Sequence, residues 1–160
     1  AMAEQEQESV IRVREALAAA GVSGEVRRLD DSARTAKEAA NALGIVPAQI
    51  ASSLIFMADG QAVLVVASGG HRVDTTKVAA ILGVDEVGKA TADDVRAATS
   101  FAIGGVAPIG HPAPLRTIVD TDLAQFDEVW AAGGHPHYVF PTSFDELVRI
   151  TGGTPADVGA

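Results

Sequence analysis

Residues 52–69, SSLIFMADGQAVLVVASG, decide the fold, because they place two β-rich runs on either side of a turn signal. The runs flank Ala58-Asp59-Gly60-Gln61, and an Asp-Gly pair supplies the positive backbone dihedrals of a tight hairpin turn. The second run is apolar on both faces, which is typical of a strand inside a sheet. The stretch therefore predicts a β-hairpin whose second strand is central.

Helical segments lie on both sides of this hairpin along the chain. In TAKEAANALG, Thr35 and Glu38 have the spacing of a capping box, and Gly44 ends the segment. Helices are predicted over residues 9–21, 35–44, 73–83 and 91–99, and from Ser143 onward. Short strands are predicted over residues 25–30 (at a sheet edge), 117–120, 127–134 and 137–140. This order mixes hairpins with helices, which indicates a single α+β domain rather than a doubly wound one.

The composition is that of a globular domain with an aliphatic core. Of the 160 residues, 48% are hydrophobic and only 4% are aromatic. The chain has no cysteine, which excludes disulfides, thiolate metal sites and a cysteine nucleophile. The formal net charge of −9 argues against a broad basic face for DNA or RNA. No apolar run is long enough to span a membrane, and the polar start is unlike a signal peptide. We expect a cytoplasmic protein without membrane contact, with residues 1–8 disordered.

The most unusual stretch is SFAIGGVAPIGHPAP, residues 100–114, which combines three glycines, three prolines and a histidine. Glycine permits positive φ and close approach, whereas proline fixes φ and removes an N–H. The stretch predicts a rigid loop, anchored by Val106 and Ile109, in which the glycine pair directs two N–H groups the same way. Such donors stabilise negative charge that develops on an ester or amide carbonyl. A purely structural Ω-loop fits the same residues.

Other constellations carry weaker signals. His135-x-His137 places two imidazoles on one strand face, but no third ligand motif accompanies them, so we predict no metal site. The chain has neither a G-x-S-x-G elbow nor a Walker loop. Ser52 and Ser53 are candidate nucleophiles only if a histidine lies near them in the fold.

Four segments follow one another along the chain: TAKEAANALGIVPAQIASSLIF, AVLVVASGGHRVDTTKVAAILG, FAIGGVAPIGH and IVDTDLAQFDEVWAAGG. Their order resembles the YbaK/EbsC family, the aminoacyl-tRNA deacylases related to the editing domain inserted in bacterial prolyl-tRNA synthetases. The resemblance covers nearly the whole chain. It implies a mixed, curved β-sheet flanked by helices, with a cleft for the amino acid on the 3′ end of a tRNA.

The implied activity is hydrolysis of the ester of a mischarged tRNA, without a cofactor, as a second sieve behind a synthetase. The neighbouring ribose hydroxyl assists the water, so no protein nucleophile is required. The implied catalytic residues are Gly104, Gly105, Pro108 and Ser52. The expected substrate-binding residues are Thr35, Ile50, Ser53, Leu54, Ile103, His111, Gly133, Gly134 and His135. The expected partners are the aminoacylated acceptor end of a tRNA and an aminoacyl-tRNA synthetase.

One position departs from the family pattern. Relatives commonly read I-x-K-S-L where this chain reads Ile50-Ala51-Ser52-Ser53-Leu54, so Ser52 occupies the lysine position. That lysine places a point charge beside the phosphate of the terminal nucleotide, and a serine supplies no charge. Three interpretations stay open. The site acts with different substrate placement, it uses Lys37 or an arginine instead, or the domain is a non-catalytic module that binds an amino acid, an aminoacylated RNA end or a partner protein.

Overall fold

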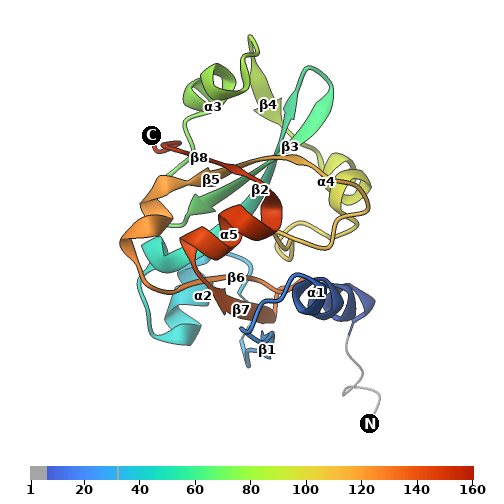
Figure 1. Cartoon of the computed structure of the whole chain (residues 1–160), viewed down its shortest axis with the longest axis vertical. Helices are drawn as coiled ribbons and strands as arrows, with labels where there is room; N and C mark the ends of the chain where they lie inside the picture. The colour runs from blue at the N-terminus through green and yellow to red at the C-terminus, as the bar shows by residue number, and fades with distance from the viewer. Residues whose placement is uncertain (1–6, 32) are drawn as a thin grey trace.

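The protein is an open mixed β-sheet with helices on both faces (Figure 1). The structure is a computed structural model, and it describes residues 7–31 and 33–160. The helices are α1 (Glu8–Ala19), α2 (Ala36–Leu43), α3 (Thr75–Leu82), α4 (Ala92–Thr99) and α5 (Phe144–Thr151), with 3-10 turns η2 (Pro47–Gln49) and η3 (Thr121–Gln125). The strands are β1 (Arg27–Arg28), β2 (Ile50–Ala58), β3 (Gln61–Ser68), β4 (Val87–Lys89), β5 (Arg116–Asp120), β6 (Val129–Ala132), β7 (Tyr138–Thr142) and β8 (Thr154–Ala156).

The strand order shows that the sheet is mixed. Within the described residues, eight strands form one sheet in the order β1-β7-β6-β2-β3-β5-β8, and β4 pairs separately with β2. β2 and β3 are antiparallel, whereas β2 pairs with β6, and β3 with β5, in the parallel sense. The hairpin thus provides the two inner strands, and β3 is central as predicted.

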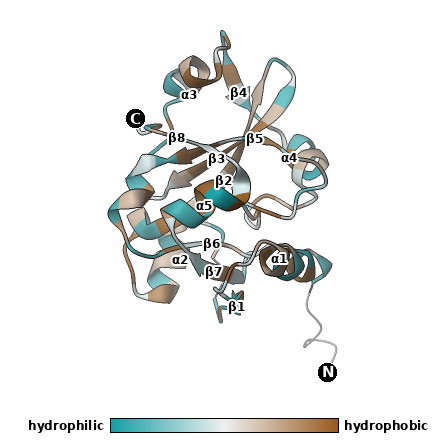
Figure 2. Cartoon of the chain, viewed as in Figure 1, coloured by the Kyte–Doolittle hydropathy of each residue, from teal (hydrophilic) through white to brown (hydrophobic). Residues whose placement is uncertain are grey.

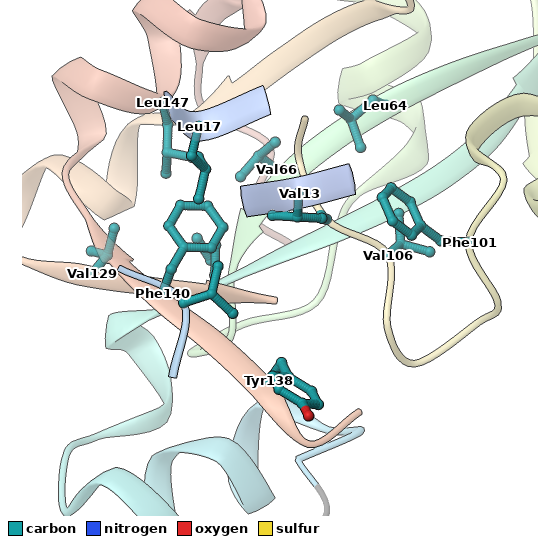
Figure 3. Packing of buried hydrophobic residues seen from close by; sticks show 14 of the residues in the cluster. Val13, Leu17, Leu64, Val66, Phe101, Val106, Val129, Tyr138, Phe140 and Leu147 are labelled. Atoms are coloured by element: carbon teal, nitrogen blue, oxygen red, sulfur yellow. The ribbon is translucent and has the colours of Figure 1, made fainter. Parts of the chain in front are cut away.

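Side chains of the sheet alternate between two apolar layers. Leu64 and Val66 of β3 face α1, α4 and α5, where the largest core cluster also contains Val13 and Phe140 (Figure 3). Val65 faces the other way, toward α3. A third cluster joins α2 to β6 and β7. Figure 2 shows brown segments along the central strands and helices banded brown and teal, as expected for helices that cover a sheet with one face.

Local signals in the sequence correspond to the elements that form. Asp59 (φ 51°) and Gly60 (φ 77°) make the hairpin turn. Thr35 and Glu38 form a complete capping box on α2, and Thr91 with Asp94 form another on α4. Strands β4 and β8 and the two 3-10 turns were not predicted. Residues 1–6 of the segment expected to be disordered lie outside the described residues, and Glu8 already belongs to α1.

The helices in the described part of the chain are too short or too polar to cross a bilayer.

The layer around β3 contains the largest cluster of buried apolar side chains, which includes Leu64 and Val66. Leu64 is 1% exposed in this layer, and we expect Leu64→Ala to lower the free energy of unfolding by about 2–5 kcal/mol, because the substitution leaves a cavity. Urea denaturation measures this change. Ile11→Ala on the outer side of α1 is the control, since Ile11 is 44% exposed, and its loss should stay below about 1 kcal/mol. Equal losses in both variants would contradict this account of the core.

Candidate functional site

The sheet has an opening along one edge of β2. At its start β2 pairs with β6 through Ile50 and Ala51, and at its end it pairs with β4 from Phe56 to Ala58. Among the described residues, the segment 52–55 has a ladder partner only on its β3 side. A strand edge without a partner presents backbone N–H and C=O groups that are free to bind another molecule.

The hairpin turn determines which backbone groups face this opening. A two-residue turn makes Ala58 and Gln61 a hydrogen-bonded pair, so the even-numbered residues of β2 bond to β3. Ser53 therefore directs its N–H and C=O toward the opening, where no ladder partner within the described chain meets them. The Oγ atom of Ser53 is also buried and without a hydrogen-bond partner. The N–H, C=O and Oγ of Ser53 therefore all lack a partner within the described chain.

A cleft of about 690 Å³ lies at this opening. Residues of both faces of β2 line it, together with the start of α2, the end of β6 and the loop after α4. The lining is mainly apolar, and two of its side chains are unusually open, Leu54 (38% exposed) and Ile103 (60% exposed). Such an apolar hollow with a few polar groups is the usual form of a small-molecule site.

The loop after α4 forms one wall of the cleft through a tight turn. The N–H of Gly105 donates to the carbonyl of Ala102 (3.1 Å), and Gly104 in between has φ 93°. The expectation that both glycines present their amides is therefore wrong for Gly105, because its N–H closes the turn. Gly104 and Val106 do line the cleft, and neither amide has a hydrogen-bond partner within residues 7–31 and 33–160.

Buried packing behind the loop holds this turn in place. A Cβ added to Gly105 would lie 2.9 Å from the Cα of His135, so only glycine permits this approach. Pro108 is buried, and Val106 and Ile109 anchor the loop in the core as predicted. The Nε2 of His111 lies 2.8 Å from the carbonyl oxygen of Ala107. Most of these contacts involve residues that do not line the cleft, so they hold the loop without occupying the site.

The predicted site residues thus divide into two groups. Those that line the cleft are Thr35, Ile50, Ser52, Ser53, Leu54, Ile103 and Gly104. Those outside its lining are Gly105, Pro108, His111, Gly133, Gly134 and His135. Side chains that line it without having been predicted include Arg34, Phe56, Lys89 and Trp130. Phe56 could have been predicted, because alternate residues of a strand share a face and Phe56 lies two residues after Leu54. No pattern in the residues around Lys89 predicts that it lines the cleft.

The second group supports the cleft from the α1 side. Gly133 donates its N–H to the carbonyl of Tyr138 (2.8 Å), and Gly134 lies against Ser9 and Val13 of α1. The ring of His135 stacks on that of His137 with centroids 5.8 Å apart. Burial, followed by the charges of His137, Arg28 and Arg34, lowers the pKa of His135, so this ring is neutral near pH 7.

Among the residues that the structure describes, no histidine is hydrogen-bonded to Ser52 or Ser53. A second, smaller groove adjoins the cleft at Ser52 and extends to His71 and Arg72. Both ring nitrogens of His71 are occupied, however: Nδ1 by the carbonyl of Arg72 (2.9 Å) and Nε2 by the carboxylate of Asp120 (2.7 Å). A serine nucleophile of the Ser–His type is therefore not assembled at Ser52.

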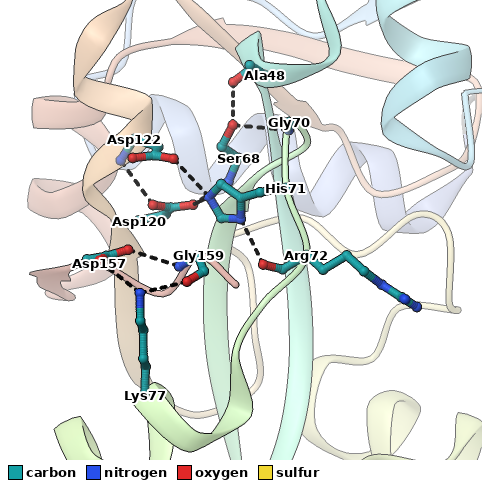
Figure 4. A network of polar contacts seen from close by, with 10 residues as sticks. All are labelled: Ala48, Ser68, Gly70, His71, Arg72, Lys77, Asp120, Asp122, Asp157 and Gly159. Atoms are coloured by element: carbon teal, nitrogen blue, oxygen red, sulfur yellow. Dashed lines mark hydrogen bonds and ion pairs between the residues drawn. The ribbon is translucent and has the colours of Figure 1, made fainter.

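His71 belongs to a polar network beside this groove (Figure 4). Asp120 is fully buried and accepts hydrogen bonds from the N–H groups of Ser68 and Asp122. The Nε2 atom of His71 lies 2.7 Å from Asp120 and 3.1 Å from Asp122. These residues are of metal-ligating types, but their separations are those of hydrogen bonds, and a protonated imidazole satisfies both carboxylates. Burial disfavours that charge, yet the bond to the Arg72 carbonyl and the two carboxylates outweigh it and raise the pKa of His71.

Comparison with known proteins gives a consistent set of relatives. Residues 30–150 match the model of the family described as "Aminoacyl-tRNA editing domain". A crystal structure called "a putative trans-editing enzyme for prolyl tRNA synthetase" superposes with a TM-score of 0.91 at 41% identity, over 98% of this chain and 99% of that one.

Two curated proteins show how the matched region occurs elsewhere. The uncharacterized protein YwhH of Bacillus subtilis (strain 168) is 31% identical over 128 residues, which are 79% of this chain and 81% of YwhH. The proline–tRNA ligase of Nitratidesulfovibrio vulgaris (strain DP4) is 30% identical over 103 residues, which are 64% of this chain. The match spans only 18% of that ligase.

The raised pKa of His71 predicts a pH-dependent contribution to stability. Because the folded state binds this proton more tightly, the contribution is complete below the pKa of an unfolded histidine, about 6.5, and is lost as pH rises through the raised value. We expect His71→Gln to lower the free energy of unfolding by about 1–3 kcal/mol at pH 6 and by less at pH 9. Denaturant titrations of both proteins across this range measure the difference. A difference that does not change with pH would exclude a charged His71.

Proposed function

This chain belongs to the aminoacyl-tRNA editing domain family, and on that premise we propose that it hydrolyses the ester that joins a wrongly attached amino acid to its tRNA. The substrate class is an aminoacylated tRNA 3′ end, and the reaction releases a free amino acid and an uncharged tRNA. Family membership and the similarity to a trans-editing enzyme structure support this assignment. The cleft at the opening of the sheet is the site to which we assign the reaction.

The observation that carries the proposal is the set of unsatisfied polar groups of Ser53 inside an apolar cleft. Buried polar groups in folded proteins almost always have partners, so a buried Oγ without one suits a ligand that supplies it. An aminoacyl group offers both parts of the match. Its side chain suits the apolar walls, and its ammonium and ester groups suit the free N–H, C=O and Oγ of Ser53.

The chemistry requires stabilisation of charge more than a protein nucleophile. Water adds to the ester carbonyl, the bond to the ribose oxygen breaks, and that oxygen takes up the proton. The carbonyl oxygen becomes negative on the way, and preorganised N–H donors stabilise such a charge without reorganising. The amide of Gly104 at the cleft wall is our candidate donor, and the ribose hydroxyl next to the ester assists the water.

The charge of the chain limits how the tRNA is held. A net charge of −9 argues against a broad basic face that would hold the tRNA body. We therefore propose that it contacts the acceptor end alone, in the cytoplasm, and that an aminoacyl-tRNA synthetase contributes the remaining tRNA contacts.

Ser52 favours a second candidate function. Since Ser52 replaces the lysine expected from the family pattern, the same cleft could bind an aminoacylated RNA end, an amino acid or a partner protein without hydrolysis. Deacylation assays separate the two functions, because only the first releases amino acid at a rate proportional to protein concentration.

The purified protein should deacylate at least one member of a panel of mischarged tRNAs, and Gly104→Ala should lower that rate at least ~10-fold. A side chain at φ 93° strains the turn, and its Cβ would lie 3.3 Å from the Cγ of Arg34. Gly60→Ala is the matched control, since Gly60 also has positive φ (77°) but lies in the hairpin turn with open space around it. Equal rates in the two variants would contradict the role of the loop, and a panel with no protein-dependent release would contradict hydrolysis.

Ser53→Ala should separate binding from stability. The Oγ of Ser53 has no hydrogen-bond partner in the free protein, so its removal should leave the free energy of unfolding within ~0.5 kcal/mol or raise it slightly. Deacylation should nevertheless fall about 5-fold or more, because the ligand loses one partner in a desolvated site. Thermal melts and initial rates measure the two effects. A destabilised variant with normal activity would show that Ser53 serves the fold and not the substrate.

A further inference from the structure

The charges in the cleft are opposite in sign to those of the protein. The chain has 21 acidic residues against 12 lysines and arginines. Among the described residues that line the cleft, however, the charged ones are Arg34 and Lys89, and both are cationic. Carboxylates adjoin β4 along the chain at Asp85, Glu86 and Asp93, but they do not line the cleft. A hollow with only positive charge in an acidic protein indicates an anionic ligand.

Neither cation is engaged within the described chain. Arg34 and Lys89 form no ion pair or hydrogen bond among residues 7–31 and 33–160. Lys77 shows the contrast, since its Nζ binds the carboxylate of Asp157 (3.0 Å) and the carbonyl of Gly159 (2.7 Å). Lys89 and Arg34 are therefore free to bind a ligand without first breaking an ion pair.

The register of β4 places Lys89 on the same face as Ser52. Lys89 pairs directly with Phe56, and directly opposed residues share a face of the sheet. Ser52 lies on that face too, four residues before Phe56, or about 13 Å along the strand. A lysine has a flexible four-carbon stem, so side chains at positions 52 and 89 can converge on one anion between them.

We propose that Lys89, with Arg34, binds the phosphodiester next to the aminoacyl ester. This inference rests on the proposed function, because it assumes that an aminoacylated nucleotide occupies the cleft. Lys89 then supplies from β4 the positive charge that Ser52 does not supply from β2. Lys89 is the cleaner residue to test, since the side chain of Arg34 also packs on Gly104.

The test compares two non-hydrolysable ligands, an amide-linked 3′-aminoacyl adenosine with and without a 5′-phosphate. Both ligands are made with each amino acid of the mischarged tRNA panel, and the amino acid whose unphosphorylated ligand the wild-type protein binds most tightly is used throughout. The wild-type protein should bind the phosphorylated ligand about 5- to 10-fold more tightly in calorimetric titrations. Lys89→Ala should remove most of this advantage and leave the affinity for the unphosphorylated ligand unchanged. Lys37→Ala is the control, because Lys37 lies on α2 outside the lining of the cleft, and it should retain the full advantage.

The second variant moves the positive charge from position 89 on β4 to position 52 on β2. Ser52→Lys in the Lys89→Ala background should restore the phosphate advantage, which a merely structural role of Lys89 would not allow. The proposal is overturned if Lys89→Ala keeps the wild-type advantage, or if it weakens both ligands equally. Phosphate-dependent binding without deacylation would contradict the proposed hydrolysis and leave this inference intact. Failure of the wild-type protein to bind either ligand would overturn both.

Discussion

The edge of β2 that faces away from β3 is paired only at its two ends, and the rest of the site depends on this constraint. Parallel β6 pairs with the first residues of β2, and antiparallel β4 pairs with its last residues. Between them the sheet opens at Ser53, where backbone groups that a sheet normally satisfies are left for a ligand. The cleft is therefore a gap in the sheet itself.

The loop after α4 closes one side of this gap and is held from behind. His135 lies against Gly105, His111 binds the carbonyl of Ala107, and Arg12 binds the carbonyl of Gly110 (3.0 Å) while its guanidinium lies over the ring of Phe101. Helix α1 therefore supports the loop through Arg12, although no residue of α1 lines the cleft. Such support keeps the Gly104 turn rigid, which is what a preorganised donor requires.

The sequence predicts those parts of the structure that depend on neighbouring residues. The hairpin turn at Asp59-Gly60 and the caps of α2 and α4 are local chemistry, and they form as expected. β4 and β8 were missed because three-residue strands have too short a pattern to recognise, and only long-range pairing forms them.

The same distinction holds for the site. The sequence predicts Ser53 and Leu54 as site residues because they are consecutive in one strand, β2. Lys89, in contrast, lies at the cleft only because β4 pairs with β2 at Phe56. His111 and His135 were placed in the site because they adjoin its motifs in the chain, but a residue next to a loop in sequence can lie on its buried side. The amide of Gly105 shows the same limit, since turn closure used the donor that the glycine pair was expected to present.

Hydrogen exchange at single backbone amides tests the central claim most directly, because it reports which N–H groups of β2 lack a partner. In the free protein the amide of Leu54, which bonds to β3, should be strongly protected, and that of Ser53 should exchange much faster although both lie in an inner strand. The amide-linked aminoacyl adenosine should then slow exchange at Ser53 selectively. Equal protection of the two amides in the free protein, or no change at Ser53 in the complex, would contradict a binding site at the gap in the sheet.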